Sequence, residues 1–237
     1  MFDWFMSTEN KIRKHQRRVT NRDTQPDERE QSVRWLLDEG SPKALRALLM
    51  RFDMTLPHQL NDKAEREHTY DLLLVKGDEL LRPLRLHLKK CRSFAYPLRM
   101  FEEVTDAEQT IEMVYELIRI EYEKEDLNHP EKKRNLLIWL AERKHSGAVA
   151  AVEPLLKDFD EGVRIATIEV LLHQDEANLA SMLEGALCRA EEDSNRIRVR
   201  VAQVFAQRGW SVSDGDQVGS RLPQGYRLDG SRVVASA

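Results

Sequence analysis

The chain has 237 residues, of which 41% are hydrophobic and 33% are charged, and the charges nearly cancel to a formal net charge of -4. This balance argues against a general nucleic-acid binder, whose domain is usually strongly basic. No apolar run approaches the ~20 residues of a membrane-spanning helix, and no apolar segment typical of a secretory signal is present. The composition favours a cytoplasmic protein in which Cys91 and Cys188 are reduced thiols of the core.

Residues 1–30 predict an N-terminal extension, in which an aromatic cluster is followed by basic residues. The aromatic residues are Phe2, Trp4 and Phe5, and the basic candidates for docking are Lys11, Arg13, Lys14, Arg17 and Arg18. The aromatic cluster could cap the apolar end of a helical array or dock on a partner. Alternatively, residues 1–18 could make weak, reversible contact with an anionic membrane. We favour capping or partner docking.

Glycine and proline total only 18 residues in the chain, and strand-like alternation is nearly absent before residue 210, so residues 31–104 are expected to be helical. They predict two pairs of helices: 31–52 with 61–77, joined by an irregular link at 53–60, and 78–90 with 93–104.

Residues 106–209 predict three further pairs of helices. The pairs are 106–123 with 129–143, 149–156 with 161–173, and 175–187 with 194–209. Pro130 suits the first turn of its helix, Ser194 is a plausible N-cap, and Gly209 is a plausible C-terminal cap.

The second helix of the later pairs is apolar around nearly its whole circumference, as in "VRIATIEVLL" at 163–172. Such a helix must be covered on several sides. A similar segment lies 34 residues later and another 30 residues earlier, and these shifts place Arg164 over Arg198 and Arg134. A unit that recurs in this way, and is too small to bury its own apolar face, stacks on copies of itself.

Pro154 in the first helix, Asp158 and Asp160 at the turn, and Val163–Arg164 in the second helix resemble a HEAT repeat. The resemblance is good for 147–173, fair for 106–143 and 176–208, and weak for 31–104. It implies an all-α, right-handed α-solenoid of about five helical hairpins over residues 31–209. It also implies a structural ladder between repeats, with the members Asp158, Asp160, Arg134, Arg164 and Arg198. In the last pair Glu192 stands where Asp158 does. The chain also resembles a broad group of bacterial HEAT-repeat proteins, which implies a fold and no particular activity.

Residues 210–237 are rich in Gly, Ser and Asp and predict a less regular C-terminal tail. Asp229–Gly230 is a turn signal between two short extended stretches, so a small hairpin or a tail laid on the last pair is expected.

The sequence contains no HExxH, Walker, GxGxxG or GxSxG motif, and we predict no catalytic site, no metal site and no cofactor. HEAT-like repeats also occur in lyases that attach bilin pigments and in a class of DNA glycosylases, and both remain alternatives. The basic stretch 82–99 would suit a nucleic acid, but the acidic stretch 102–126 follows it directly and makes that partner unlikely.

We therefore predict a non-catalytic scaffold or adaptor that binds another protein through the surface of the second helices. Charge clustering selects the candidate contacts. These are the basic residues Arg82, Arg85, Lys89, Lys90, Arg92 and Arg99 and the acidic residues Glu112, Glu116 and Glu123. The alternative explanation is that the two stretches are solvated neighbouring faces that attract one another.

Overall fold

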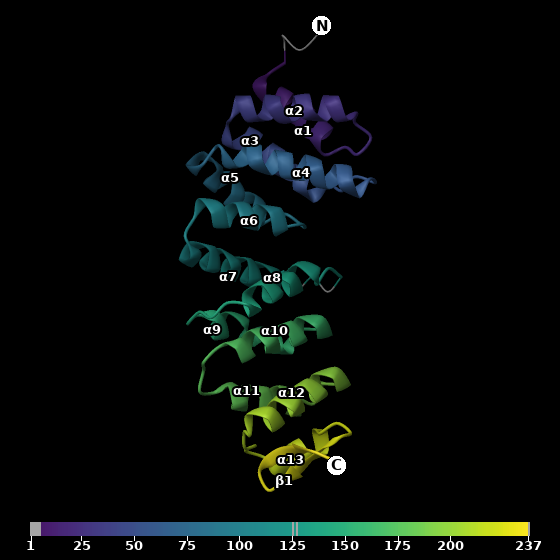
Figure 1. Cartoon of the computed structure of the whole chain (residues 1–237), viewed down its shortest axis with the longest axis vertical. Helices are drawn as coiled ribbons and strands as arrows, with labels where there is room; N and C mark the ends of the chain where they lie inside the picture. Colours follow the sequence, from purple (N-terminus) through teal and green to yellow (C-terminus); the bar gives the residue numbers. More distant parts are fainter. Residues whose placement is uncertain (1–5, 125, 127, 237) are drawn as a thin grey trace. The chain divides into compact units, whose positions relative to one another are not determined.

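The computed structural model describes residues 6–124, 126 and 128–236. In that part of the chain, thirteen α-helices are present with one two-stranded sheet near the C-terminus, so the chain is all-α (Figure 1). Among the described helices, none combines the length and the apolar character needed to cross a bilayer. The chain divides into two compact units, residues 1–117 and 118–237, and each is described by itself.

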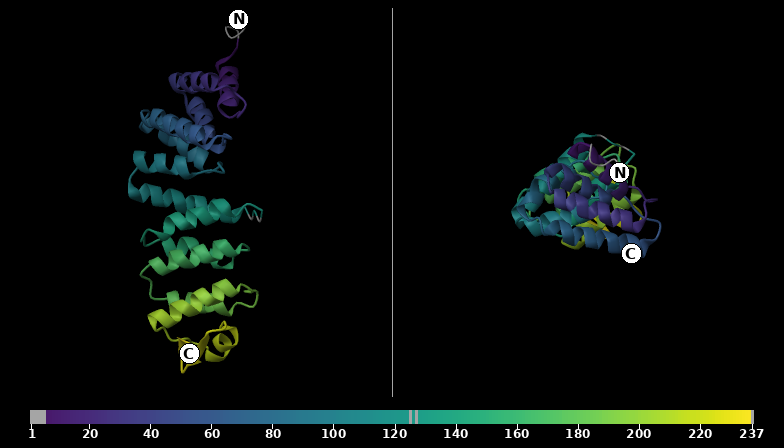
Figure 2. Two further views of the ribbon diagram at one scale, coloured as in Figure 1. Left: turned by 45° about the vertical axis from the view of Figure 1, so that its right-hand side comes forward. Right: turned by 90° about the horizontal axis from the view of Figure 1, so that it is seen from above.

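Unit 1 (residues 1–117) is a set of packed helices. Its elements are α1 (Thr8–Val19), α2 (Pro26–Glu39), α3 (Pro42–Leu49), the 3-10 helix η2 (Met50–Asp53), α4 (Gln59–Leu74), α5 (Asp78–Leu88), α6 (Ala95–Val104) and the larger part of α7 (Ala107–Glu123). Helix α1 packs on α2 and α3, α3 packs on α5, and α6 contacts both α4 and α5 (Figure 2). The expected boundary after residue 30 falls inside α2.

The structure corrects the predicted helix 31–52, which is two helices. Gly40 ends α2 with a φ of 68°, a left-handed conformation that glycine adopts without steric cost. The Ser41 hydroxyl then accepts the backbone N–H of Ala44 as the N-cap of α3, and Pro42 occupies the first turn. The main partner of α3 is α5, whereas the sequence paired this segment with 61–77.

Unit 2 (residues 118–237) contains the later pairs of helices and the C-terminal hairpin. Its elements after α7 are α8 (Glu131–Ala141), α9 (Ala148–Val152), the 3-10 helix η3 (Glu153–Lys157), α10 (Glu161–His173), α11 (Leu179–Cys188), α12 (Asn195–Arg208), α13 (Gly215–Arg221), β1 (Tyr226–Asp229) and β2 (Arg232–Ala235). Helices α8, α10 and α12 follow one another in both figures, and α10 contacts the other two (Figure 1, Figure 2).

Helix α10 is covered on several sides, which explains why its sequence is apolar around the whole circumference. It contacts α8, α9, η3, α11 and α12, and its residues Val163, Val170 and Leu171 have no exposed surface. The helix before it changes from α to 3-10 geometry at Glu153, next to Pro154. Proline lacks an N–H and clashes with the preceding turn, so the α-helix ends there.

The C-terminal tail is more regular than its composition predicts, because α13 precedes the hairpin. The two strands are antiparallel, with Asp229 opposite Arg232 and Gly230 in the turn at a φ of 60°. Strand β2 packs on α12 and buries Val233. The turn signal at Asp229–Gly230 is therefore confirmed as a hairpin.

Two glycines of unit 2 should respond in opposite directions to replacement by alanine. Gly209 ends α12 at a φ of 64°, so Gly209→Ala is expected to lower the free energy of unfolding by about 1–2 kcal/mol. Gly185 lies inside α11, where an added Cβ meets nothing within 4 Å, so Gly185→Ala is expected to raise the free energy of unfolding by about 0.5–1 kcal/mol. Hydrogen exchange of peptides from unit 2 measures both changes, and two shifts of the same sign would contradict these assignments.

Candidate functional site

A buried ion pair connects consecutive turns in unit 2. Arg164, near the start of α10, donates from Nε and Nη2 to the two carboxylate oxygens of Glu192, both at 2.9 Å. Its Nη1 also donates to the carbonyl oxygen of Asp158 at 2.9 Å. Glu192 is only 1% exposed, so this is a desolvated, bidentate pair that holds the turn before α10 against the turn before α12.

The preceding step of this ladder uses a different cation from the one that the sequence predicts. Lys133 donates to the carboxylate of Asp158 and is itself buried. Arg134 has the sequence position equivalent to Arg164, but its side chain lies beside Gly162, where a Cβ would be 3.2 Å from its Nη1.

The other two ladder candidates cap helix starts or turns. Asp160 is the N-cap of α10 and accepts the backbone N–H of Val163 at 2.8 Å. Arg198 donates from Nη2 to the carbonyl oxygen of Glu192. These contacts fix the turns at which the first helices meet the second helices of unit 2.

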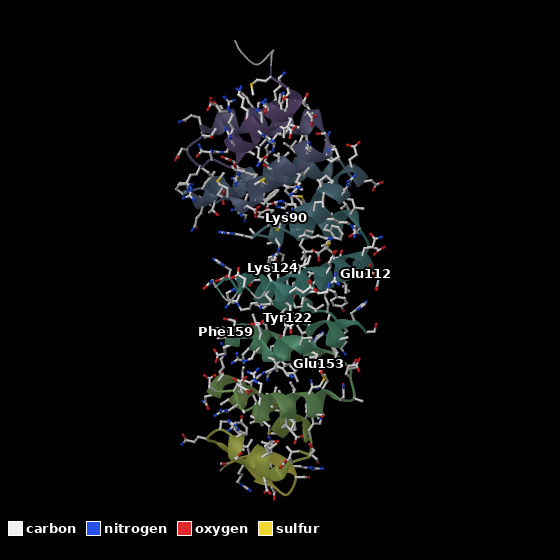
Figure 3. The ribbon with its side chains drawn as sticks, turned by 180° about the vertical axis from the view of Figure 1, so that it is seen from behind. Lys90, Glu112, Tyr122, Lys124, Glu153 and Phe159 are labelled. Carbon is white, nitrogen blue, oxygen red and sulfur yellow. The ribbon has the colours of Figure 1, made fainter. Side chains whose placement is uncertain are left out.

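A groove of about 750 Å³ lies in unit 2 between the end of α7, η3, α11 and α13. Its lining residues are Tyr122, Glu153, Pro154, Leu156, Lys157, Ser181, Met182, Gly185, Ala186, Cys188, Arg189 and Gln217. Figure 3 labels two of them, Tyr122 on α7 and Glu153 on η3. The groove lies on the side of the first helices, whereas the sequence analysis favoured the surface of the second helices.

Small side chains on α11 open this groove. Ser181 and Gly185 are four residues apart and so share a face of the helix, and Ala186 next to them also lines the groove. The buried face of α11 carries leucines such as Leu183. The Ser181-to-Gly185 spacing is visible in the sequence, but the elements opposite it are not.

The groove combines apolar walls with charges of both signs. Tyr122 is 45% exposed, and Met182 and Leu156 add further apolar surface. Glu153 contributes a negative charge and Lys157 a positive one. Such a mixture suits a ligand that has both apolar and charged side chains.

Arg189 connects the wall of the groove to the buried ion pair of Glu192. Its Nη2 donates to Glu192 at 3.2 Å, while its Nε is buried and has no hydrogen-bond partner among the described residues.

The thiol in the groove is poorly suited to act as a nucleophile. Burial raises the pKa of Cys188, and the negative charges of Glu184 and Asp214 raise it further. Because the thiolate is the reactive form, this surrounding favours a binding role for the groove over a covalent one.

The surface of the second helices has a smaller and more polar hollow of about 350 Å³. Arg200 on α12 donates from Nε and Nη2 to Glu169 on α10, at 2.6 and 2.7 Å. Arg200 and Glu169 in this hollow are therefore already paired with each other, and Arg208 donates to the carbonyl oxygen of Leu172.

Two of the predicted basic contacts cover aromatic rings in unit 1. The guanidinium of Arg85 lies 5.1 Å from the ring centre of Phe101, and that of Arg99 lies 4.2 Å from the ring centre of Tyr70. Nη1 of Arg99 is also 3.5 Å from Oε2 of Glu67. Interaction with Tyr70 raises the pKa of Arg99 above its ordinary value.

An ion pair joins the basic and acidic stretches within unit 1. Nζ of Lys89 is 2.5 Å from Oε1 of Glu116. Glu112 is exposed on α7, and Glu123 lies 3.9 Å from Arg119, one turn earlier on the same helix. The exposed basic candidates are Arg82, Lys90, Arg92 and Arg99, and Figure 3 labels Lys90 and Glu112. The structure thus leaves part of the charged surface available and uses the rest internally.

The N-terminal candidates fall into two groups. The aromatic residues Phe2, Trp4 and Phe5 lie outside the described residues. The basic residues Lys11, Arg13, Lys14, Arg17 and Arg18 lie on α1. This helix buries Ile12 and Val19 and packs on α2 and α3, so it is an integral part of unit 1.

A buried network of charges joins α2, η2 and α4 in unit 1. Arg51 is 1% exposed, and its Nη2 donates to Asp62 at 2.9 Å and to Glu65 at 3.4 Å. Arg29 donates to both oxygens of Glu65 at 2.8 Å, and Nε of Arg66 is 2.9 Å from Oδ2 of Asp62. The three arginines and two carboxylates stabilise the link between these elements.

The two carboxylates of this network are held in the ionised form. Burial raises the pKa of Asp62, but the hydrogen bonds from Arg51 and from the Leu56 N–H, with the charges of Arg51 and Arg66, lower it further than burial raises it. For Glu65, burial is likewise outweighed by Arg29 and Arg51, so its pKa also lies below the ordinary value. This network therefore acts as a structural element of unit 1.

A second cluster in unit 1 contains three types of metal ligand, although the sequence predicted no metal site. A carboxylate oxygen of Asp53, a ring nitrogen of His87 and the sulfur of Cys91 all lie within 4.8 Å of one another. His87 and Cys91 are four residues apart, a ligand spacing that the sequence-based prediction missed. Asp53 comes from a different element, η2, and nothing in the sequence places it there.

Comparisons of the chain with protein-family models, with curated proteins and with solved structures found no significant match. Function is therefore inferred from the groove and the clusters described above.

Proposed function

We propose that the chain is a non-catalytic protein-interaction adaptor, built as a HEAT-like α-solenoid, whose groove in unit 2 binds a short segment of another protein. The observation that carries the proposal is the groove itself, which has apolar walls and charges of both signs. The successive packing of α8, α10 and α12, with ion pairs between their turns, supports the solenoid part.

The residue types at the groove favour a protein ligand. Tyrosine, methionine and arginine are enriched at protein interfaces, and Tyr122, Met182 and Arg189 line three parts of the groove. A partner segment with apolar side chains would cover Tyr122 and Met182.

The framework around the groove is fixed before any ligand binds. Glu192, which accepts from Arg189, also accepts from Arg164, so the wall of the groove is tied to the buried ladder. A preorganised site loses less conformational entropy on binding, because its side chains are already ordered.

This function is tested by selecting peptides from a displayed random library against the full chain and measuring their affinities. Ala186→Arg should fill the groove and weaken the selected peptides by about tenfold or more. The matched control is Ala150→Arg, the same substitution at an exposed position of α9 that does not line the groove, and it should leave their affinities unchanged. Peptides that bind both variants as tightly as the natural chain would show that the groove is not the binding site.

A further inference from the structure

The cluster of Asp53, His87 and Cys91 lies where three segments of unit 1 meet. Asp53 is the last residue of η2, His87 lies in the last turn of α5, and Cys91 follows that helix. Nε2 of His87 is 3.7 Å from Oδ2 of Asp53. This cluster lies in unit 1 and shares no residue with the groove in unit 2.

The backbone holds these side chains in position. The N–H of Cys91 donates to the carbonyl oxygen of His87 at 2.8 Å, so the helical turn continues past the end of α5 and keeps both side chains on one face. The N–H of Ser93 donates to Oδ1 of Asp53 at 3.3 Å. This bond ties η2 to the loop after α5 and leaves the other carboxylate oxygen facing His87.

We propose that Asp53, His87 and Cys91 form a binding site for a zinc-type divalent metal ion. Imidazole nitrogen, thiolate sulfur and carboxylate oxygen are together the ligand set of Zn²⁺, whereas Mg²⁺ and Ca²⁺ prefer oxygen alone. Zinc lies about 2.0–2.3 Å from such ligands, so neighbouring ligand atoms of a tetrahedral site are roughly 3.5 Å apart. The three ligand atoms lie within 4.8 Å of one another, and Nε2 of His87 is 3.7 Å from Oδ2 of Asp53, so metal binding would draw them closer together.

Asp53 is the exposed member of the site. His87 and Cys91 are 4% and 5% exposed, so water reaches the metal mainly from the side of Asp53. Asp53 also lines a cavity of about 600 Å³ together with residues of the loop between α1 and α2. A water molecule from this cavity would complete four-coordination. Binding converts the Cys91 thiol to thiolate and releases its proton to solvent, so metal affinity falls as the pH is lowered.

Cobalt(II) tests the site in the full-length, metal-free protein. One equivalent of Co²⁺ should give the near-ultraviolet absorption of thiolate-bound cobalt and the strong visible bands of four-coordinate cobalt, and Zn²⁺ should displace both. Cys91→Ala should abolish the thiolate band. Cys188→Ala, which removes the other cysteine, should leave the spectrum unchanged. His87→Gln and Asp53→Asn should weaken cobalt binding by more than the ~10 to 100-fold that loss of an outer-shell partner costs.

A second measurement needs no variant and covers the case in which Cys91→Ala does not fold. In the natural chain, Zn²⁺ should slow the alkylation of Cys91 by about tenfold or more while the alkylation of Cys188 keeps its rate, as mass spectrometry of the two peptides would show. Absence of a thiolate band in the natural chain would overturn the proposal. So would equal protection of both cysteines, or a band that persists in folded Cys91→Ala.

Discussion

Arg164→Met is expected to lower the free energy of unfolding of unit 2 by about 3–5 kcal/mol. The substitution keeps the apolar length of the side chain but removes the bidentate donor of Glu192, which is 1% exposed. Among the described residues, Arg189 is then the one remaining cation at this carboxylate. The loss is large because the buried carboxylate was desolvated on folding and loses both hydrogen bonds from Arg164, keeping those from Arg189 and the Ser194 N–H.

The matched control is Arg200→Met, which breaks a pair of the same chemistry and similar geometry. Arg200 also donates two hydrogen bonds to one glutamate, Glu169, but the two side chains are 31% and 40% exposed. Because solvent screens this pair, its removal should cost only about 0–1 kcal/mol. Hydrogen exchange of unit 2 peptides measures both variants. Equal losses in Arg164→Met and Arg200→Met would show that burial does not decide the strength of the ladder.

Asp62→Asn is expected to lower the free energy of unfolding of unit 1 by about 3–5 kcal/mol at neutral pH. The substitution is nearly isosteric, so it removes a charge without creating a cavity. Arg51 is 1% exposed, and after the substitution its Nη2 still has Oε2 of Glu65 at 3.4 Å as an ionic partner. The carboxylate of Glu65 is already shared with Arg29. Asp71→Asn makes the same change at an exposed position of α4 and should cost less than about 0.5 kcal/mol.

The effect of Asp62→Asn should also depend on pH. The pKa of Asp62 in the folded chain is lower than in the unfolded chain, so its stabilising contribution is present above about pH 4 and is lost as the pH falls through the folded pKa. The difference between the natural chain and Asp62→Asn should therefore shrink towards low pH, where the carboxyl of Asp62 is itself neutral. Hydrogen exchange of unit 1 peptides across this pH range measures the difference. A difference that stays constant would mean that the charge of Asp62 is not the stabilising feature.

Local signals in the sequence located several helix ends and the hairpin. Ser194 accepts the N–H of Ile197 as the N-cap of α12, Gly209 ends that helix, and Gly230 lies in the turn of the hairpin. Each of these features depends on residues within a few positions of one another. The same kind of signal, Gly40 with Ser41, lies inside the predicted helix 31–52 and marks the break that the structure shows there.

The remaining features depend on contacts between distant residues. The sequence pattern places Glu192 at the position of Asp158 and Arg134 at the position of Arg164. Packing, however, brings Lys133 to the carboxylate of Asp158. His87 and Cys91 are four residues apart, yet Asp53 joins them only because η2 packs near the end of α5. The small residues of α11 likewise become a groove only through the elements that face them.

The measurement that tests the proposed adaptor function most directly is photo-cross-linking in cells that express the full chain. A photoreactive amino acid would replace Ser181, which is exposed in the groove, or Asn135, which is exposed on α8. We predict a cross-linked protein of defined mass from position 181 that is absent from position 135, is lost on adding Ala186→Arg and is competed by the selected peptides. No product at position 181, or the same product from both positions, would contradict a binding function of the groove.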